Sequence, residues 1–198
     1  MDDRNSAPAV ARVIKVGGSL FANPDFPDRF RQWLDQFSDA GNSTLLVAGG
    51  GRLVDCVRQL QAPLGLTDEF CHVASLQLMS TTSRLLQHLL PEVPIIDSLD
   101  QSRQHDLAIL DCVHLAATQS QLPRTWDTTS DSLAAEMAVF TGCDELWLLK
   151  SVLPDSPRMV DWIAQGVVDA NFPGASKGLQ SVYLVNFGDA NLLSIRGI

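Results

Sequence analysis

Three groups of residues in this sequence have the types and spacing that bind phosphate. The first is the run "VIKVGGSLF", which places a lysine inside an apolar stretch and follows it with glycines and a serine: Lys15, Gly17, Gly18 and Ser19. A lysine in a buried strand requires an anion beside it, because an unpaired buried charge is costly. The second is the glycine run "VAGGG", which contains Gly49, Gly50 and Gly51.

Glycines let backbone N–H groups approach an anion closely and form a concave nest for it. Each glycine run alone fits a tight turn as well as a phosphate site. Two runs at the ends of neighbouring predicted strands, one of them beside Lys15, favour a phosphate site.

The third group is "WDTTSDSLAAEM" over 126–137, where hydroxyl and carboxyl side chains crowd the start of a predicted helix. A capping box between Thr128 and Asp131 explains one threonine and one aspartate. It assigns no task to the remaining polar and aromatic residues, which are Trp126, Asp127, Thr129 and Ser130. Trp126 fits either the core or the wall of a ligand pocket.

Short apolar runs alternate with longer amphipathic patterns along the chain. The predicted strands are 12–18, 43–51, 94–97, 107–110, 145–152 and 181–186. The predicted helices are 27–40, 52–61, 66–90 and 128–144, with a short helix or loop over 159–166. The run 145–152 is continuously apolar, which is typical of a strand buried on both faces.

This alternation predicts an α/β fold: a three-layer α/β/α sandwich with a mainly parallel central sheet. Ligands of such sheets bind at the carboxyl ends of the strands, where all three polar groups lie. We expect a single domain over residues 1–198, with the first ten residues loosely ordered.

Composition excludes several classes of protein. The net charge of −9 argues against a broad nucleic-acid-binding face. The four cysteines have neither CxxC nor zinc-finger spacing, so we predict reduced, mostly buried thiols, no metal site of their own and a cytoplasmic protein. No signal peptide and no membrane-spanning segment is predicted. A Walker A loop and a GxGxxG fingerprint are both absent, which argues against a dinucleotide-binding oxidoreductase.

Taken together, the motifs resemble those of the amino acid kinase family, which includes carbamate, acetylglutamate, uridylate and aspartate kinases. The resemblance rests on "VIKVGGSL", "LLVAGGGRLVD" and "TSDSLAAEMAVFTGCDELWLLKSV", in this order, and covers about residues 12–152. Within the family, the compact length and "WDTTSDSLAAEMA" are most similar to the short kinases of methanofuran biosynthesis. Those enzymes phosphorylate an aminomethyl-furan methyl phosphate.

The resemblance implies a role for each group of residues, with ATP and Mg²⁺ as cofactors. Lys15 would stabilise the transferred phosphoryl group, and Asp131 would organise the active-site lysine. ATP would be bound by Gly17, Gly18, Ser19, Lys150, Ser151 and Lys177. The acceptor, a small molecule carrying a phosphate or carboxylate, would be bound by Gly49, Gly50, Gly51, Arg52, Asp55, Trp126, Asp127, Thr129 and Ser130.

The sequence departs from the family after the third motif. Only 48 residues follow Lys150, so the nucleotide-binding portion, 145–198, is short, and "LPDSP" replaces the usual "DGI" or "DGV". The second catalytic lysine is therefore Lys150 or Lys177. A non-catalytic, anion-binding or assembly protein on the kinase scaffold is the alternative function. The resemblance also implies a homodimer or larger homo-oligomer, with 66–90 as the candidate contact.

Overall fold

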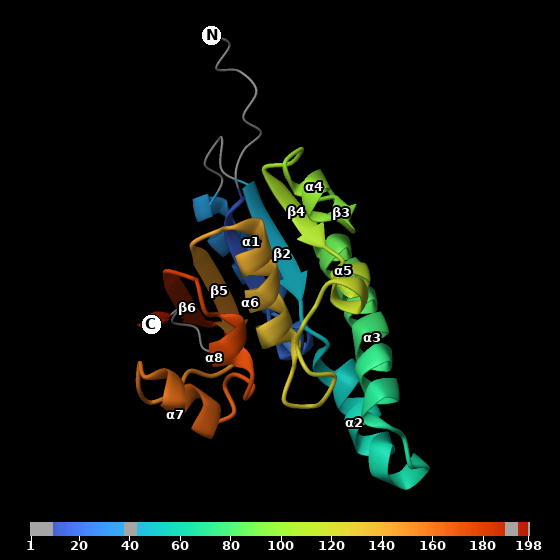
Figure 1. Cartoon of the computed structure of the whole chain (residues 1–198). Helices are drawn as coiled ribbons and strands as arrows, with labels where there is room; N and C mark the ends of the chain where they lie inside the picture. Colours follow the sequence, from blue (N-terminus) through green and yellow to red (C-terminus); the bar gives the residue numbers. More distant parts are fainter. Residues whose placement is uncertain (1–9, 38–42, 189–193, 198) are drawn as a thin grey trace.

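A seven-stranded sheet forms the centre of the molecule (Figure 1). The computed structural model describes residues 10–37, 43–188 and 194–197. The strands lie in the order β3-β4-β2-β1-β5-β6-β7, and only β7 is antiparallel to its neighbour. Their bounds are β1 Val10–Val16, β2 Ser43–Ala48, β3 Ile95–Ile96, β4 Leu107–Leu110, β5 Glu145–Lys150, β6 Ser181–Asn186 and β7 Ser194–Gly197. The predicted mainly parallel α/β fold is confirmed.

Helices cover both faces of this sheet. They are η1 Gly18–Ala22, α1 Phe26–Leu34, η2 Asp35–Phe37, α2 Gly51–Leu64, α3 Asp68–Leu89, α4 Leu99–Ser102, α5 Val113–Thr118, α6 Ser130–Thr141, α7 Met159–Ala164 and α8 Phe172–Ala175. Figure 1 shows α6 and α8 in front of the sheet and α1 behind it. The long helix α3 flanks the β4 side, and α2 packs along it.

Side-chain alternation along the strands assigns Lys15 to the face that α6 covers. Val13 packs in the apolar cluster under α6, whereas Ile14 and Val16 pack in the cluster under α1. With a period of two, Lys15 shares the face of Val13. The same rule places Lys150 two residues beyond Leu148 on that face. The sheet therefore aims both lysines at α6.

Aromatic side chains fill the opposite face. Phe30 of α1 is fully buried and lies 5.1 Å from Phe26 and 6.3 Å from Phe187 between ring centroids. Trp33 lies edge-on to Trp147 of β5, at 5.9 Å. This face carries no charged residue of the site, so its contribution is a rigid backing for β1 and β5.

Several predicted boundaries need correction. The strand 181–186 is not the last, because β7 follows it as an antiparallel edge strand. Trp147 is only half-buried and stacks on Tyr183 at 4.1 Å, so β5 is not buried on both faces throughout. The short helices α4, α5 and α8 span too few residues to show a helical period. Residues 1–9 and 38–42, which include the end of the predicted helix 27–40, lie outside the described residues.

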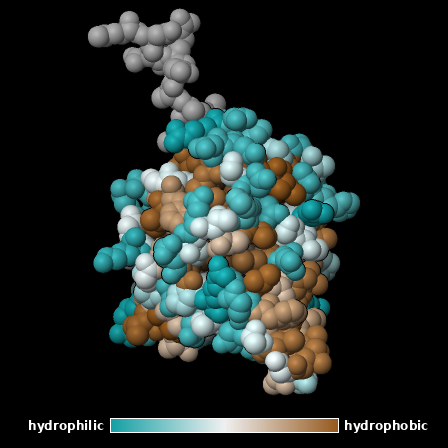
Figure 2. Space-filling model, turned by 45° about the vertical axis from the view of Figure 1, so that its right-hand side comes forward, coloured by the Kyte–Doolittle hydropathy of each residue, from teal (hydrophilic) through white to brown (hydrophobic). Residues whose placement is uncertain are grey.

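Helix α2 and the first turns of α3 stand apart from the sheet. None of the side chains of α2 is buried, and Leu60, Leu64 and Phe70 are each about half exposed or more, at 49%, 63% and 55%. Figure 2 shows hydrophobic side chains gathered at the lower right, where these two helices meet. Contact between copies through residues 66–90 stays a prediction. Among the described residues, no helix is both long and apolar enough to cross a bilayer.

Candidate active site

One buried carboxylate joins two lysines at the carboxyl edge of the sheet. Asp131, in the first turn of α6, lies 2.8 Å from the Lys15 ammonium and 2.6 Å from the Lys150 ammonium, one carboxylate oxygen to each. All three side chains are almost fully buried. Lys150 also donates a hydrogen bond of 2.6 Å to the carbonyl of Val167. The strands β1 and β5 are adjacent, which explains why residues 135 positions apart meet here.

The three groups perturb one another's protonation. Burial alone would raise the pKa of Asp131, but the two ammonium groups outweigh burial and lower that pKa to about 2. Burial and, to a smaller extent, the neighbouring Lys15 lower the pKa of Lys150 to about 8, although Asp131 opposes the shift. The site therefore carries a fixed negative charge on Asp131 and a surplus of positive charge on the lysines.

A second carboxylate closes the N-terminus of α6. Asp169, in the loop after α7, accepts hydrogen bonds from the N–H groups of Thr129 and Ser132 and from both of their hydroxyls. Thr129 is the N-cap residue of α6, and its hydroxyl also accepts a bond from the Asp131 N–H at 3.4 Å. The predicted capping box of Thr128 with Asp131 is wrong, because the Asp131 carboxylate is engaged by the lysines.

The two glycine runs pack directly against each other. A Cβ atom on Gly18 would lie 2.2 Å from the backbone nitrogen of Gly51, and one on Gly17 would lie 2.5 Å from the carbonyl oxygen of Leu149. Gly51 itself has a φ of +53°, which favours glycine. A Cβ on Gly49 would meet the Ser130 hydroxyl at 2.9 Å and the Lys15 side chain at 3.0 Å. The glycines are needed for loop packing as well as for any ligand.

Two helices begin at this contact without a side-chain cap. Neither η1, which follows Gly17, nor α2, which follows Gly50, has a side chain bonded to its first N–H groups. First-turn N–H groups have no partner within their own helix, and they attract anions. Lys15 lies beside both turns, since its side chain approaches the Cβ position of Gly49. The arrangement can therefore bind a phosphate at α2 and η1 but not at α6, whose N-terminus Asp169 occupies.

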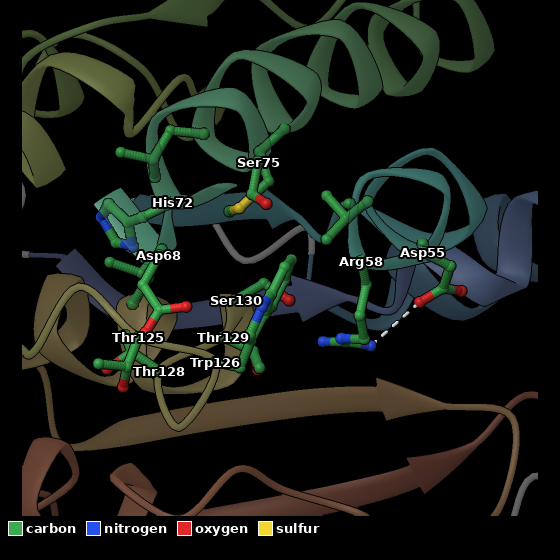
Figure 3. Close-up of a pocket in the computed structure, with 16 residues that line it drawn as sticks. Asp55, Arg58, Asp68, His72, Ser75, Thr125, Trp126, Thr128, Thr129 and Ser130 are labelled. Carbon is green, nitrogen blue, oxygen red and sulfur yellow. Dashed lines mark hydrogen bonds and ion pairs between the residues drawn. The ribbon is translucent and has the colours of Figure 1, made fainter. Parts of the chain in front are cut away.

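A cavity of about 200 Å³ opens next to these turns (Figure 3). Its walls come from α2, α3, the segment before α6 and the first turn of α6. The lining residues are Gly50, Gly51, Val54, Asp55, Arg58, Asp68, His72, Ser75, Leu76, Met79, Thr125, Trp126, Thr128, Thr129, Ser130 and Leu133. Arg58 lies over the Trp126 ring at 4.4 Å and pairs with Asp55 at 3.2 Å. The indole N–H of Trp126 donates to Gln61, which in turn donates to Asp68 at 2.7 Å.

The charges in this cavity do not balance. Burial, followed by the nearby Arg124, lowers the pKa of His72, so its ring is neutral at pH 7. Arg58 and Asp55 compensate each other. Asp68 keeps a negative charge that no cation in the cavity lining offsets, and the buried Ser75 hydroxyl oxygen has no hydrogen-bond partner. The cavity therefore suits a ligand that brings hydrogen-bond donors or a positive group.

The structure brings together most of the residues that the motifs singled out. Lys15, Asp131 and Lys150 form one cluster, and the glycine turns, Ser130 and the cavity adjoin it. Ser19 and Ser151 lie at the neighbouring strand ends with their hydroxyls 3.4 Å apart. The individual binding roles of these residues stay predictions.

Three of the singled-out residues lie away from this group. Arg52 and Asp127 are exposed and do not line the cavity. Lys177 is also exposed, in the turn that leads to the start of β6, whereas Lys150 lies at the end of β5. Parallel strands begin and end at opposite edges of a sheet, so the structure does not bring Lys177 to the lysine cluster.

Sequence reasoning missed several residues of the site: Arg58, Asp68, Ser75 and Asp169. Arg58 and Asp68 each carry a signal in hindsight. Arg58 lies seven residues after Gly51, two helical turns along α2, and Asp68 follows the N-cap Thr67 of α3. Asp169 had no signal, because it reaches α6 through tertiary contact alone.

No family model matches the sequence, and no curated protein matches it significantly. Solved structures do match in shape. The uridylate kinase of Archaeoglobus fulgidus superimposes with a TM-score of 0.63 at 18% identity, over 89% of this chain and 91% of that chain. The UMP kinase of Ureaplasma parvum gives 0.67 at 14% identity, over 93% and 92%. The aspartate kinase of Synechocystis gives 0.61 at 14% identity, over 94% of this chain and 40% of that one.

These likenesses show the fold. The chain has the amino acid kinase fold that the motifs predicted, and it spans nearly the whole length of the uridylate kinases it matches. At such identities the comparison carries no substrate and no residue role.

Replacement of Asp131 by asparagine tests the electrostatics of the cluster. The variant leaves two buried ammonium groups without their carboxylate, so at pH 6 we expect the free energy of unfolding to fall by about 3 kcal/mol. Without Asp131 the pKa of Lys150 drops further below about 8, so Lys150 sheds its proton in the folded variant at a lower pH than in the wild type. The deficit should therefore narrow by pH 9, as urea unfolding at both pH values would show. Asp155→Asn, which changes an exposed carboxylate outside the cluster, is the control and should leave the free energy of unfolding unchanged at both pH values. A loss of stability in Asp131→Asn that is the same at pH 6 and pH 9 would contradict this electrostatic account.

Proposed function

We propose that this protein is an ATP-dependent kinase that transfers a phosphoryl group to a small acceptor carrying a phosphate or carboxylate. The observation that supports it most is the cluster in which Asp131 holds Lys15 and Lys150 side by side next to two uncapped helix N-termini. Phosphoryl transfer requires positioning and neutralisation of phosphate charge and little covalent chemistry from the protein. The cluster supplies fixed positive charge in a buried place, where it acts most strongly.

In the proposed reaction an acceptor oxygen forms a bond to the γ-phosphorus of ATP, the bond from that phosphorus to the β–γ bridging oxygen breaks, and ADP leaves. Lys15 and Lys150 stabilise the negative charge on the transferred group and on the leaving oxygen. Asp131 does not take part in proton transfer, because the lysines keep its pKa near 2. It orients both ammonium groups instead. In this proposal Lys150 takes the part of the second catalytic lysine.

In the proposal, ATP and its Mg²⁺ bind beside the same cluster. Gly17, Gly18 and Ser19, with Ser151 across from them, form the predicted contact to the nucleotide phosphates. Within the described residues, no group of three or more His, Cys, Asp or Glu side chains could hold a metal ion. Because both Asp131 oxygens face lysines, Mg²⁺ would be held mainly by the phosphates of ATP, whose negative charge it would help to neutralise.

The acceptor is proposed to lie in the cavity, with its reacting group at the α2 N-terminus beside Gly49, Gly50 and Gly51. Trp126 offers a flat aromatic wall. Asp68, which is bonded to Gln61 toward the far end of α2 from Gly51, offers an uncompensated negative charge. These features favour a small planar acceptor with an amino group at its far end. An aminomethyl-furan methyl phosphate, as in methanofuran-type cofactor biosynthesis, has this chemistry and is the most specific version of the proposal.

Lysine substitutions test the kinase assignment. Lys15→Ala should abolish turnover of ATP with the furan-methyl phosphate acceptor, because it removes a charge that stabilises the transition state, while circular dichroism shows a retained fold. Lys150→Ala should reduce kcat by about 100-fold or more, in line with the loss of one strong electrostatic contact. Lys177→Ala is the matched control, since this lysine is exposed and distant from the cluster, and should leave kcat within about twofold.

Full activity of Lys15→Ala would overturn the assignment. Calorimetry with Mg-ATP separates the alternative, a non-catalytic protein on the kinase scaffold, from the kinase. That alternative is supported if Mg-ATP gives no heat of binding while inorganic phosphate or an anionic metabolite still binds and Arg58→Ala or Gly50→Val removes that binding.

An acceptor comparison tests the role of Asp68. Replacing the amino group of the acceptor by a hydroxyl should raise KM for the wild-type protein, because the amine loses its charged partner. In Asp68→Asn the two acceptors should differ much less, since one charge-assisted contact is worth about tenfold or more in affinity. Equal discrimination by both proteins would show that Asp68 does not recognise the acceptor.

A further inference from the structure

We propose that Asp169 is a positioning residue of this site, which fixes the N-terminus of α6 relative to Lys150 and so sets the geometry of the Lys15–Asp131–Lys150 cluster. The inference rests on the proposed function for its kinetic consequence only. Its structural part concerns how the two lysines and Asp131 are held. None of the sequence motifs includes Asp169.

Asp169 is unusually well bonded for a loop residue. One carboxylate oxygen accepts from the Thr129 N–H at 2.9 Å, the Thr129 hydroxyl at 2.7 Å and the Ser132 N–H at 3.1 Å. The other accepts from the Ser132 hydroxyl and from the Asn171 N–H at 3.2 Å. Every contact is a donor, so an amide in place of the carboxylate would set its own N–H₂ group against another donor.

The same loop also holds Lys150. The carbonyl of Val167, two residues before Asp169, accepts a hydrogen bond from the Lys150 ammonium. The loop thus binds β5 through the Val167 carbonyl and Lys150, and it binds α6 through the carboxylate of Asp169. Asp131 lies between Thr129 and Ser132, the two residues that Asp169 bonds. A shift of Asp169 would therefore move Asp131 away from both lysines.

Further bonds lock this loop in place. Asn171 donates through its N–H to the carbonyl of Asp127 and through its side chain to the Thr128 hydroxyl at 2.9 Å. The segment before α6, which also walls the cavity, is thereby tied to the loop after α7. A residue that only capped α6 would not require this second contact, between the loop after α7 and the segment before α6.

The negative charge of Asp169 acts on the pKa of Lys150, which can be measured separately from the stability of α6. The charged groups that face Lys150 are Asp131 from α6, Lys15 from β1 and Asp169 from the loop after α7. Asp169 favours the protonated form of Lys150. Its neutralisation should lower the pKa of Lys150 below that of the wild type, whereas a loss of packing alone would admit water and raise it toward the value of a free lysine.

The first test needs no enzymatic activity. Lysine residues labelled with ¹³C at Cε are titrated by NMR in the wild type, in Asp169→Asn and in Ser132→Ala, with the Lys150 signal assigned from Lys150→Arg. We expect the pKa of Lys150 to fall in Asp169→Asn and to stay near the wild-type value in Ser132→Ala, which loses one bond but keeps the carboxylate. Asp161→Asn, which affects only the surface contacts of Asp161 with Arg158 and Ser156, is the matched control and should leave the pKa of Lys150 unchanged.

The second test is kinetic. Asp169→Asn should lower kcat by about 10- to 100-fold, the size of effect that a small misplacement of reacting groups produces, with little change in the KM for ATP. Ser132→Ala should show a smaller loss of kcat. If Asp169→Asn does not fold, Ser132→Ala carries the test, and a kcat within twofold of the wild type would then overturn the proposal.

Two results would contradict the inference outright. The first is a Lys150 pKa that is unchanged or raised in a folded Asp169→Asn protein. The second is a lower melting temperature with unchanged kcat, which would make Asp169 a helix cap and nothing more. If no variant, including the wild type, transfers phosphate, the kinase proposal fails, while the NMR titration still tests whether Asp169 sets the charge state of Lys150.

Discussion

The pairing of one buried carboxylate with two buried ammonium groups is the constraint on which this site depends. Asp131, Lys15 and Lys150 could not be buried separately, since each lone charge would be too costly to desolvate. Together they hold β1, β5 and the start of α6 in one arrangement. The cluster also has one positive charge in excess, so an anion bound beside it completes the charge balance. A stable fold and an anion site thus have the same cause.

The helix N-termini around this cluster divide into two kinds. The N-terminus of α6 is closed by Asp169, which uses its N–H groups and leaves the helix free to carry Asp131. Those of η1 and α2 have no side-chain cap and face the region of Lys15. In the proposed reaction, this division would direct a phosphate to the glycine turns and leave the cavity between α2 and α3 for the rest of the acceptor.

Much of this arrangement could be predicted from local sequence. The short apolar runs at β1 and β5 and the glycines after β1 and β2 were enough for the sheet, its carboxyl edge and the partnership of Lys15 with an anion. The antiparallel strand β7 and the four-residue helices were too short to give a periodic signal. Asp169 could not be found, because its role comes from contacts between segments distant in sequence. The choice between Lys150 and Lys177 needed the topology of the sheet. Lys150 lies at the end of β5, whereas Lys177 precedes the start of the parallel strand β6, at the opposite edge of the sheet.

The most direct measurement of the central claim is the titration of Lys150 in the presence of a nucleotide. With ¹³C-labelled lysine, the pKa of Lys150 is measured with and without a non-hydrolysable Mg-ATP analogue. Phosphate oxygens beside the ammonium favour its charged form, so the account predicts that the pKa rises above about 8 and that the Lys15 signal shifts as well. If saturating analogue leaves both lysine signals and the Lys150 pKa unchanged, the cluster does not bind the nucleotide phosphates and the account is wrong.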